Sequence, residues 1–324
     1  SYIQIMSIFL TLSDEASDDS WKTSIPKYNG LGTEGIGSVF QYQILLSFYA
    51  DFIGIDFIFP GSENLSHHSY TEYSEKEFHQ NIDSFFNFPK MNNNWDQVFM
   101  FAELQSTNDP RGAEIFNGEL VSFIQKNKDT EKNILINLHW CHLYLLKFCQ
   151  QNASEIFTKE RIESIRDNLI FTGKKYFDDS INISLHLRTA NPNDVPSEIV
   201  SPLRELYIME RDFYRYKNLI DYLKEQAKEQ KATLHIHSQG FKNNFDKFLE
   251  LIDDNFDIQL HIDDNPLSDI YHMSNADLLI ISNSSFSWLP SLLNSNQKIV
   301  RDNFTNGPFV HNCLKANYDF TQIL

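Results

Sequence analysis

The sequence predicts an α/β protein built on doubly wound parallel sheets, and three observations lead to that prediction. Short apolar runs rich in β-branched residues alternate with longer segments of helical periodicity along most of the chain. No apolar run approaches the ~20 residues that a membrane-spanning helix requires. The length of 324 residues exceeds what a single hydrophobic core usually serves. We therefore expect two domains, each with helices that connect parallel strands.

The second half of the chain shows the alternation most regularly. The expected strands are Ile181–Leu187, Ala232–His237, Asp257–His261, Asp277–Ile281 and Lys298–Val300. The expected helices are Glu210–Glu229, Phe241–Ile252, Leu267–Ser274 and Phe286–Leu293. Helices between successive strands indicate a parallel sheet, in which ligands bind at the carboxyl ends of the strands.

The first half follows the same pattern less regularly. The expected strands are Ile53–Phe59, Gln97–Phe101 and Ile134–Leu138, and the expected loops are Ser62–Ser74 and Lys90–Trp95. The expected helices are Val39–Ala50, Ala113–Gln125, Trp140–Cys149 and Thr158–Leu169. No strand is expected close before the glycine-rich segment that starts at Gly30. The predicted domains span residues 1–175 and 176–324, both Rossmann-like, and face each other across a cleft.

Charge and cysteine content narrow the class of protein. The formal net charge of −17 repels nucleic acid and anionic membrane surfaces, so neither is an expected partner. Cys141, Cys149 and Cys313 have no metal-binding spacing, and the first two lie too far apart on one predicted helix for a disulfide. A sparse, odd number of cysteines is typical of a reducing compartment, so we expect a cytoplasmic protein.

A glycine-rich segment, GLGTEGIGSVFQYQ, runs from Gly30 to Gln43. Its four glycines precede a helix expected to begin near Ser38. Glycines let the backbone approach a ligand closely, but the spacing differs from the usual dinucleotide fingerprint. A flexible turn before a capped helix explains the segment equally well.

A polar strand end, ISLHLRTANPND, runs from Ile183 to Asp194. An arginine directly after an apolar strand is costly unless it is paired or faces a cleft, and Arg188 could clamp a diphosphate with its two-pronged guanidinium. His186 is open to two interpretations, a structural histidine or a catalytic one, and the structural role is the commoner of the two.

Two further segments place polar residues after predicted strands. ADLLIISNSSFSW (Ala276–Trp288) turns from an apolar run to Ser282-Asn283-Ser284-Ser285, which either caps the next helix or points that helix N-terminus at an anion. HIDDNPLSD (His261–Asp269) places Asp263 and Asp264 after a strand, where a carboxylate could accept a hydrogen bond from a ribose or form an Asx turn.

Together these segments resemble motifs of the fucosyltransferase superfamily, which includes α-1,2-, α-1,6- and protein O-fucosyltransferases. The H-x-R of His186-Leu187-Arg188, followed by ADLLIISNSSFS, is similar to two C-terminal motifs of that group. GIGSVFQYQ is similar to the G-[GL]-G-N-Q-x-F-Q-Y segment of the α-1,2 enzymes. The motifs occur in the family's order and span Gly30 to Trp288.

The resemblance implies a GT-B fold of two Rossmann-like domains, with acceptor binding in the first and the nucleotide sugar in the second. It implies inverting transfer of L-fucose from GDP-fucose to a glycan hydroxyl, with no metal and no cofactor besides the donor substrate. Arg188 would bind the β-phosphate. The implied nucleotide-sugar contacts are Gly35, Gly37, His186, Arg188, His237, Ser238, Asp263, Asn283, Ser284, Ser285 and Phe286. No D-x-D motif occurs, so a metal-dependent GT-A transferase has no support in the sequence.

The chain departs from the family pattern at three positions. Thr189 and Asn191 stand where H-x-R-R-x-D has its second arginine and its aspartate, and Ser38 stands where G-x-G-N has asparagine. Another sugar, such as rhamnose or xylose on GDP or UDP, remains an alternative. A non-catalytic nucleotide-sugar-binding protein is a second, and a Rossmann-type epimerase is a weaker third.

An inverting transferase also needs a base that accepts the proton of the attacking hydroxyl. Glu34 is the candidate, because it is the only charged residue between Lys27 and Asp51 and its flanking glycines leave room for an acceptor. The segment G-T-E-G-I-G also resembles the G-E-G-F-N loop of some protein O-fucosyltransferases. The alternative role is a favourable charge at the N-terminus of the following helix. Asp194 is the substitute if Glu34 is not the base.

Overall fold

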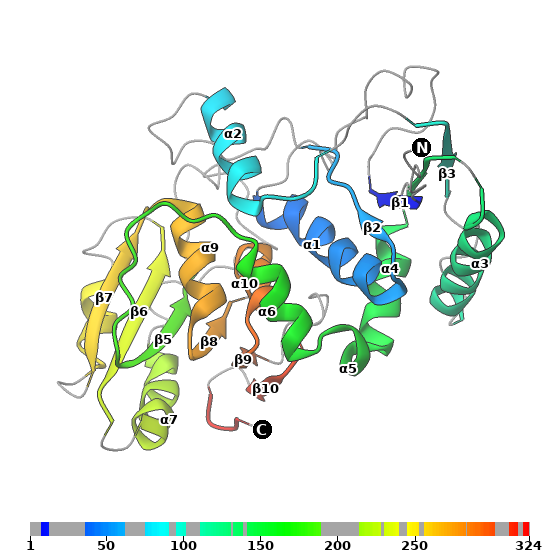
Figure 1. Cartoon of the computed structure of the whole chain (residues 1–324). Helices are drawn as coiled ribbons and strands as arrows, with labels where there is room; N and C mark the ends of the chain where they lie inside the picture. The colour runs from blue at the N-terminus through cyan, green and yellow to red at the C-terminus, as the bar shows by residue number, and fades with distance from the viewer. Residues whose placement is uncertain are drawn as a thin grey trace, which may run out of the picture. The chain divides into compact units, whose positions relative to one another are not determined.

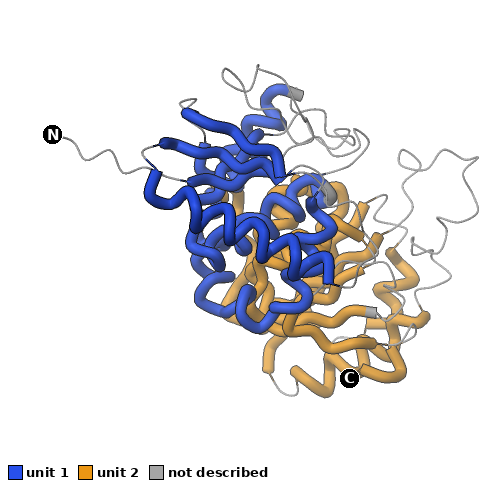
Figure 2. The backbone as a smooth tube through the Cα atoms, turned by 90° about the vertical axis from the view of Figure 1, so that its right-hand side faces the viewer, with its two compact units in different colours: residues 1–68, 73–170 blue, residues 69–72, 171–324 orange. Residues whose placement is uncertain are grey.

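The computed structural model describes residues 8–12, 36–61, 75–90, 95–101, 111–130, 132–138, 141–188, 214–227, 230–239, 245–252, 256–282, 284–301, 311–316 and 320–323. The chain divides into two compact units, one of residues 1–68 and 73–170 and the other of residues 69–72 and 171–324 (Figure 2). Both units carry a parallel sheet with helices between successive strands, which confirms the predicted α/β class.

Unit 1 holds a four-stranded sheet in the order β2-β1-β4-β3, parallel throughout. Its strands are β1 (Ile8–Thr11), β2 (Asp56–Phe57), β3 (Gln97–Met100) and β4 (Ile134–Asn137). Its helices are α1 (Ile36–Ile53), α2 (Glu75–Phe86), α3 (Gly112–Asn127), α4 (His142–Gln151), α5 (Ala153–Ile156) and α6 (Lys159–Asp167). Phenylalanines of α1, of α2 and of the segments that follow them pack together, and the rings of Phe40 and Phe86 stack with centroids 4.3 Å apart.

Three features of unit 1 differ from the prediction. β1, which was not predicted, lies in the interior of the sheet between β2 and β4. The expected strand Ile53–Phe59 is wrong at its start, because α1 continues to Ile53 and ends at Gly54, whose φ of 75° suits glycine. α2 was not predicted either, and the expected loop 62–74 lies outside the described residues.

Unit 2 holds a six-stranded sheet in the order β7-β6-β5-β8-β9-β10, again parallel (Figure 1). Its strands are β5 (Ile181–His186), β6 (Ala232–Ser238), β7 (Asp257–Ile262), β8 (Leu278–Ile281), β9 (Gln297–Arg301) and β10 (Cys313–Ala316). Its helices are α7 (Tyr216–Ala227), α8 (Asp246–Leu249), α9 (Pro266–Asn275) and α10 (Ser285–Leu293). The five predicted strands are all present; β10 is the addition.

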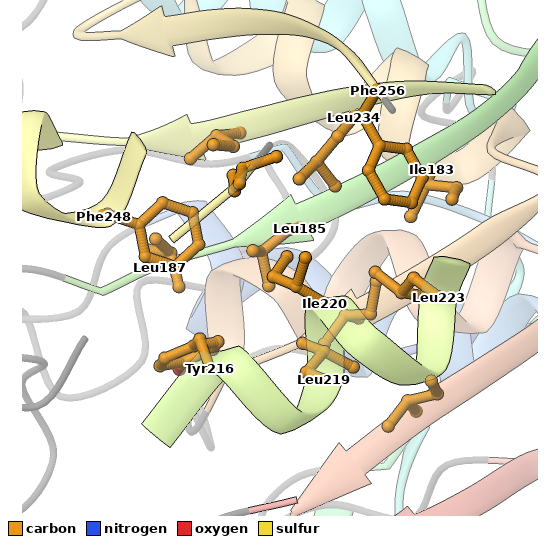
Figure 3. Packing of buried hydrophobic residues seen from close by; sticks show 14 of the residues in the cluster. Ile183, Leu185, Leu187, Tyr216, Leu219, Ile220, Leu223, Leu234, Phe248 and Phe256 are labelled. Atoms are coloured by element: carbon orange, nitrogen blue, oxygen red, sulfur yellow. The ribbon is translucent and has the colours of Figure 1, made fainter. Parts of the chain in front are cut away.

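One face of this sheet carries the hydrocarbon core of unit 2. Leu185 of β5 and Leu234 of β6 pack there against Leu219, Ile220 and Leu223 of α7, all with no exposed surface (Figure 3). These residues of α7 form its buried stripe, although residues 210–213 of the expected helix Glu210–Glu229 lie outside the described part. Residues 241–244 of the expected helix Phe241–Ile252 are likewise outside, and α8 covers its middle.

Cys141, Cys149 and Cys313 form no disulfide with one another, which agrees with the prediction for the pair Cys141 and Cys149. Cys141 lies at the N-cap of α4 rather than within a common helix with Cys149. In the part of the chain that the structure describes, no helix combines the length and the apolar character needed to cross a membrane.

Candidate nucleotide-sugar site

The sheet of unit 2 has one topological switch point, between β5 and β8. From β5 the chain proceeds outward through β6 to β7, then crosses back to β8 on the other side of β5 and continues to β9 and β10 (Figure 1). Doubly wound sheets bind ligands outside the carboxyl ends of the two strands from which connections leave in opposite directions. The two C-terminal motifs of the sequence follow these two strands.

A hydrogen bond joins the two motifs at this point. His186, the last residue of β5, lies 2.7 Å through Nδ1 from Oγ of Ser282, directly after β8. The ring of Phe286 from α10 lies 5.5 Å from the His186 ring. Burial, together with the charges at His237 and Arg188, lowers the pKa of His186 to about 3, so the ring is neutral at neutral pH. Residues almost a hundred positions apart in sequence thus form one polar edge.

The N-terminus of α10 is built from serines. Ser284 caps the helix, accepting a hydrogen bond from the backbone N–H of Phe286 at 3.3 Å. Ser287 Oγ donates to the backbone oxygens of Ser282 and Ser284, both at 3.2 Å. No acidic residue occupies the first turn, so the partial positive charge of the helix end is not neutralised locally. Both interpretations of the serine run therefore have support. Ser284 caps α10, and the N-terminus of this helix is suited to bind an anion.

Arg188 follows β5 by two residues and is partly exposed. The intervening Leu187 donates its N–H to His237 O at 2.9 Å, which continues the pairing of β5 with β6 beyond the carboxyl end of β5. The charge of Arg188 contributes to the lowered pKa of His186, as expected for two neighbouring groups at one strand end. The site therefore holds a cation beside a neutral imidazole.

Ser238 and Asp263 lie at the carboxyl ends of the next two strands. Ser238 Oγ donates to Leu187 O at 2.6 Å, and Asp263 N donates to Ser238 O at 3.0 Å. Asp263 is exposed and has a φ of 55°, a left-handed conformation in which few residues other than glycine, asparagine and aspartate are found. The Asx turn proposed for this segment belongs to Asn265, whose Oδ1 accepts from Leu267 N and caps α9.

His237 is enclosed by protein rather than open to a ligand. Its Nδ1 lies 2.8 Å from Asp269 Oδ1 and its Nε2 lies 3.2 Å from Ser184 Oγ. Both nitrogens are occupied, and neither His237 nor Ser184 has exposed surface. A contact of this ring with guanine would require the ring to give up an internal partner. Because Ser184 is inaccessible, its alignment with His237 and Asp269 holds the fold together and is not a nucleophilic triad.

The other predicted residues are not tested against this group. Gly37 lies in the first turn of α1, in unit 1, and is buried. Glu34, Gly35, Asp194 and Asn283 lie outside the described residues, so their predicted roles stay predictions. Ser285, in contrast, begins α10 beside Phe286. In the described part of the chain, no three His, Cys, Asp or Glu side chains gather as metal ligands would.

Sequence reasoning missed Ser282 and the polar residues beneath the site. Ser282 belongs to the serine run that was singled out, and its place directly after a strand was the available signal. Asp269 and His272 of α9 were not anticipated, because they sit in a helix whose other inward residues, such as Ile270 and Met273, are apolar. Asp269 is explained by its bond to His237 of β6, and His272 by its bonds to Tyr176 N and Ser268 O.

No protein-family model matches the sequence, and no curated protein matches it either. Solved structures with partial likeness include the following three. The structure of POFUT1 in complex with GDP is 12% identical, with 98% of this chain and 99% of that chain covered and a TM-score of 0.38. Escherichia coli heptosyltransferase WaaC with ADP-2-deoxy-2-fluoro heptose is 10% identical, with 97% and 95% covered and a TM-score of 0.41. A family 9 glycosyltransferase from Veillonella parvula DSM 2008 is 11% identical, with 97% and 86% covered and a TM-score of 0.40. Likeness at this level assigns neither a family nor a substrate.

Proposed function

We propose that this protein is an inverting, metal-independent glycosyltransferase of the GT-B type that transfers L-fucose from GDP-fucose to a hydroxyl of a glycan acceptor. The observation that carries the proposal is the bond between His186 and Ser282. It joins the two family-like motifs at the switch point of a doubly wound sheet, where a nucleotide sugar would bind. Arg188 lies at the same edge.

The chemistry requires two groups besides the binding surface. The acceptor oxygen attacks C1 of the sugar while the bond from C1 to the diphosphate oxygen breaks, and the configuration inverts. Arg188 neutralises the charge that develops on the leaving diphosphate, which is the largest electrostatic demand of the step. Glu34 takes the proton from the acceptor hydroxyl, with Asp194 as the substitute base. No cofactor besides the donor takes part in this scheme.

Nucleotide binding is the direct test. GDP should raise the melting temperature of the protein more than UDP, CDP or ADP, because a ligand that binds only the folded state stabilises it by mass action. A largest shift with UDP would remove the fucosyl assignment and leave a transferase for another sugar. No shift with any nucleotide would remove the nucleotide-sugar site altogether.

Arg188→Ala should weaken the GDP shift and lower turnover by about 10²–10³-fold, the range for loss of one preorganised electrostatic group. Arg188→Lys should not restore activity, since lysine lacks the two-pronged guanidinium. Arg215→Ala is the matched control, because this arginine lies in the same unit and contacts Tyr214 at the surface. Full turnover by Arg188→Ala would contradict the role.

A non-catalytic nucleotide-sugar-binding protein is the second candidate, favoured by Thr189 and Asn191 in place of the family's arginine and aspartate. The two candidates differ in turnover rather than in binding. Glu34→Gln keeps the shape of the side chain but cannot accept a proton, so it should bind GDP normally and lose about 10²–10⁴-fold in turnover. Binding of GDP-fucose without any transfer or hydrolysis by the parent protein would favour the binding protein.

A further inference from the structure

A chain of three hydrogen bonds crosses the sheet of unit 2 beneath α9. Oδ2 of Asp264 lies 3.1 Å from Nδ1 of His261, at the end of β7. Nε2 of His261 lies 3.2 Å from Nδ1 of His235, on β6. Nε2 of His235 lies 3.1 Å from Oδ1 of Asn182, on β5. Each imidazole therefore has both nitrogens within hydrogen-bond distance of a partner.

Both ends of this chain accept hydrogen bonds and donate none. Asn182 presents its carbonyl oxygen, because its Nδ2 already donates to the backbone oxygens of Asp178 at 2.9 Å and Ser180 at 2.8 Å. Exchanging the two amide atoms would turn a carbonyl toward two carbonyls. Asp264 is a carboxylate, which accepts only. Three contacts need three hydrogens, and two neutral imidazoles supply two.

The neighbouring chain of Ser184, His237 and Asp269 shows the contrast. One end of that chain is a serine hydroxyl, which can donate to Nε2 of His237, while Nδ1–H of the ring donates to Asp269. The serine hydroxyl and the neutral imidazole each supply one hydrogen, so both contacts of this chain are hydrogen bonds without any added proton. The shortage of one hydrogen is thus particular to the pair of His235 and His261.

We propose that His235 and His261 together bind one additional proton, with Asp264 as its counter-ion, and that this proton fastens the loop between β7 and α9. With the proton bound, all three contacts are hydrogen bonds. Without it, one contact has no hydrogen and opens. The contact to Asp264 is the one that opens, because 47% of that side chain is exposed and water can replace it, whereas only 8% of the His261 side chain is exposed. The proton site does not depend on the proposed transferase activity.

Charged and titratable groups surround the pair on every side. The Tyr176 ring stacks on His261 with centroids 4.0 Å apart, and on His272 at 3.4 Å. The groups that face the pair from neighbouring elements are His237 of β6, Asp269 and His272 of α9, and Tyr176 and Asp178 before β5. Burial lowers the pKa of both histidines, while the hydrogen bond that Asp264 accepts opposes that change at His261. Uptake of the proton therefore falls below the ordinary histidine pKa of about 6.5, and a second proton is rejected by its neighbours.

Asparagine at position 264 is a sharp test. The amide of Asp264→Asn can donate to Nδ1 of His261, so the chain closes with two neutral imidazoles and needs no added proton. Ring-nitrogen NMR of the full-length protein labelled with ¹⁵N-histidine, from about pH 8 to pH 5, follows the protonation directly. Rings are assigned with His235→Gln and His261→Gln. The parent should show one imidazolium shared by this pair, and Asp264→Asn should show none. Asp263→Asn, the adjacent carboxylate outside the chain, should behave as the parent does.

Stability gives an independent reading whose sign changes with pH. Relative to the parent, Asp264→Asn should melt about 2–4 °C higher at pH 8, where the parent lacks the third hydrogen, and lower at pH 5, where the parent has gained it. Simple loss of a surface contact would lower the melting temperature at both pH values. That outcome, or neutral rings in the parent down to the pH of unfolding, or parent-like titration by Asp264→Asn, would overturn the proposal.

Discussion

The two faces of the sheet in unit 2 use the same strands but different chemistry. Ile183 and Leu185 of β5 face α7 and α8 within a hydrocarbon core (Figure 3). Their sequence neighbours Asn182, Ser184 and His186 face the other way, and all three are buried as well. β6 repeats the pattern with Leu234 and Ile236 on one face and Thr233, His235 and His237 on the other.

The difference teaches what alternation means in a buried sheet. A strand that alternates apolar and polar residues normally has one face in water. Here α9 and its neighbours cover the polar face, and each buried polar group finds a protein partner: His237 with Asp269, His235 with Asn182, His186 with Ser282. The apolar face is stabilised by the apolar surface that it removes from water, and this contribution tolerates changes in side-chain shape. The polar face depends on specific partners, each of which is costly to remove.

Lowering the pH should produce the largest difference in stability between the two faces, because the buried histidines lie on the polar face. Burial lowers the pKa of His272 to about 4 and that of His186 to about 3. His272 is held neutral by geometry, since its Nε2 accepts from Tyr176 N at 3.2 Å while its Nδ1 lies 2.8 Å from Ser268 O. In the unfolded chain both rings take up a proton near their ordinary pKa of about 6.5.

The stability that these two rings contribute is therefore complete above about pH 6.5 and is lost as pH falls toward the lowered pKa values. At 1.4 kcal/mol per pH unit for each ring, two rings amount to roughly 5 kcal/mol between pH 6.5 and pH 4.5. His237 and Asp269 add little, because burial lowers the pKa of the ring and raises that of the carboxyl.

Thermal unfolding followed from about pH 7 to pH 4.5 measures this loss. His272→Asn removes one titrating ring and should reduce the slope by about 1.4 kcal/mol per pH unit. An identical slope in the parent and His272→Asn would show that the polar face does not govern the acid response.

Breaking the buried pair of His237 and Asp269 should have the next largest effect. His237→Leu leaves a carboxyl with 6% exposure without its partner at 2.8 Å, at a cost of about 3–5 kcal/mol in the free energy of unfolding. The double variant His237→Leu with Asp269→Leu replaces the pair by hydrocarbon and should recover much of that loss. Urea unfolding measures both. Equal losses in the single and double variants would mean that packing, not pairing, holds this face.

The sequence predicted more of unit 2 than of unit 1, for physical reasons that particular residues show. Strands β5, β6 and β8 are flanked by polar turns, so their ends were located within a residue or two. In unit 1, the β-branched and aromatic run from Ile53 favoured a strand, but α1 packs deep in the core and continues through Ile53 until Gly54. The strand β1 is only four residues long and is separated from α1 by residues 12–35, so nothing local marked it.

The candidate site shows the same limit. Arg188, Ser284 and Phe286 were predicted as site residues because each lies within one short motif. The bond from His186 to Ser282 was not foreseen, since it depends on the adjacency of β5 and β8. His237 of β6 was predicted as a ligand contact because its partner, Asp269, comes from a distant element.

Ser184 and Leu185 allow the smallest and most direct comparison, because they are adjacent and face opposite sides of β5. Ser184→Ala removes the hydroxyl 3.2 Å from Nε2 of His237 and leaves a buried nitrogen unpaired, at a cost of about 1–3 kcal/mol. Leu185→Ala opens a cavity in the hydrocarbon core and should cost about 2–5 kcal/mol.

The background variant His237→Leu separates the two causes. Without the imidazole, no buried nitrogen can lose its hydrogen-bond partner. Ser184→Ala should therefore cost almost nothing in the free energy of unfolding in that background, which gives a coupling energy of about 1–2 kcal/mol. Leu185→Ala should keep its full cost, because its neighbours lie on the other face. If the serine substitution cost as much with leucine at position 237 as with histidine, the hydroxyl would be acting through packing alone. The polar face would then be held by the same physics as the apolar one.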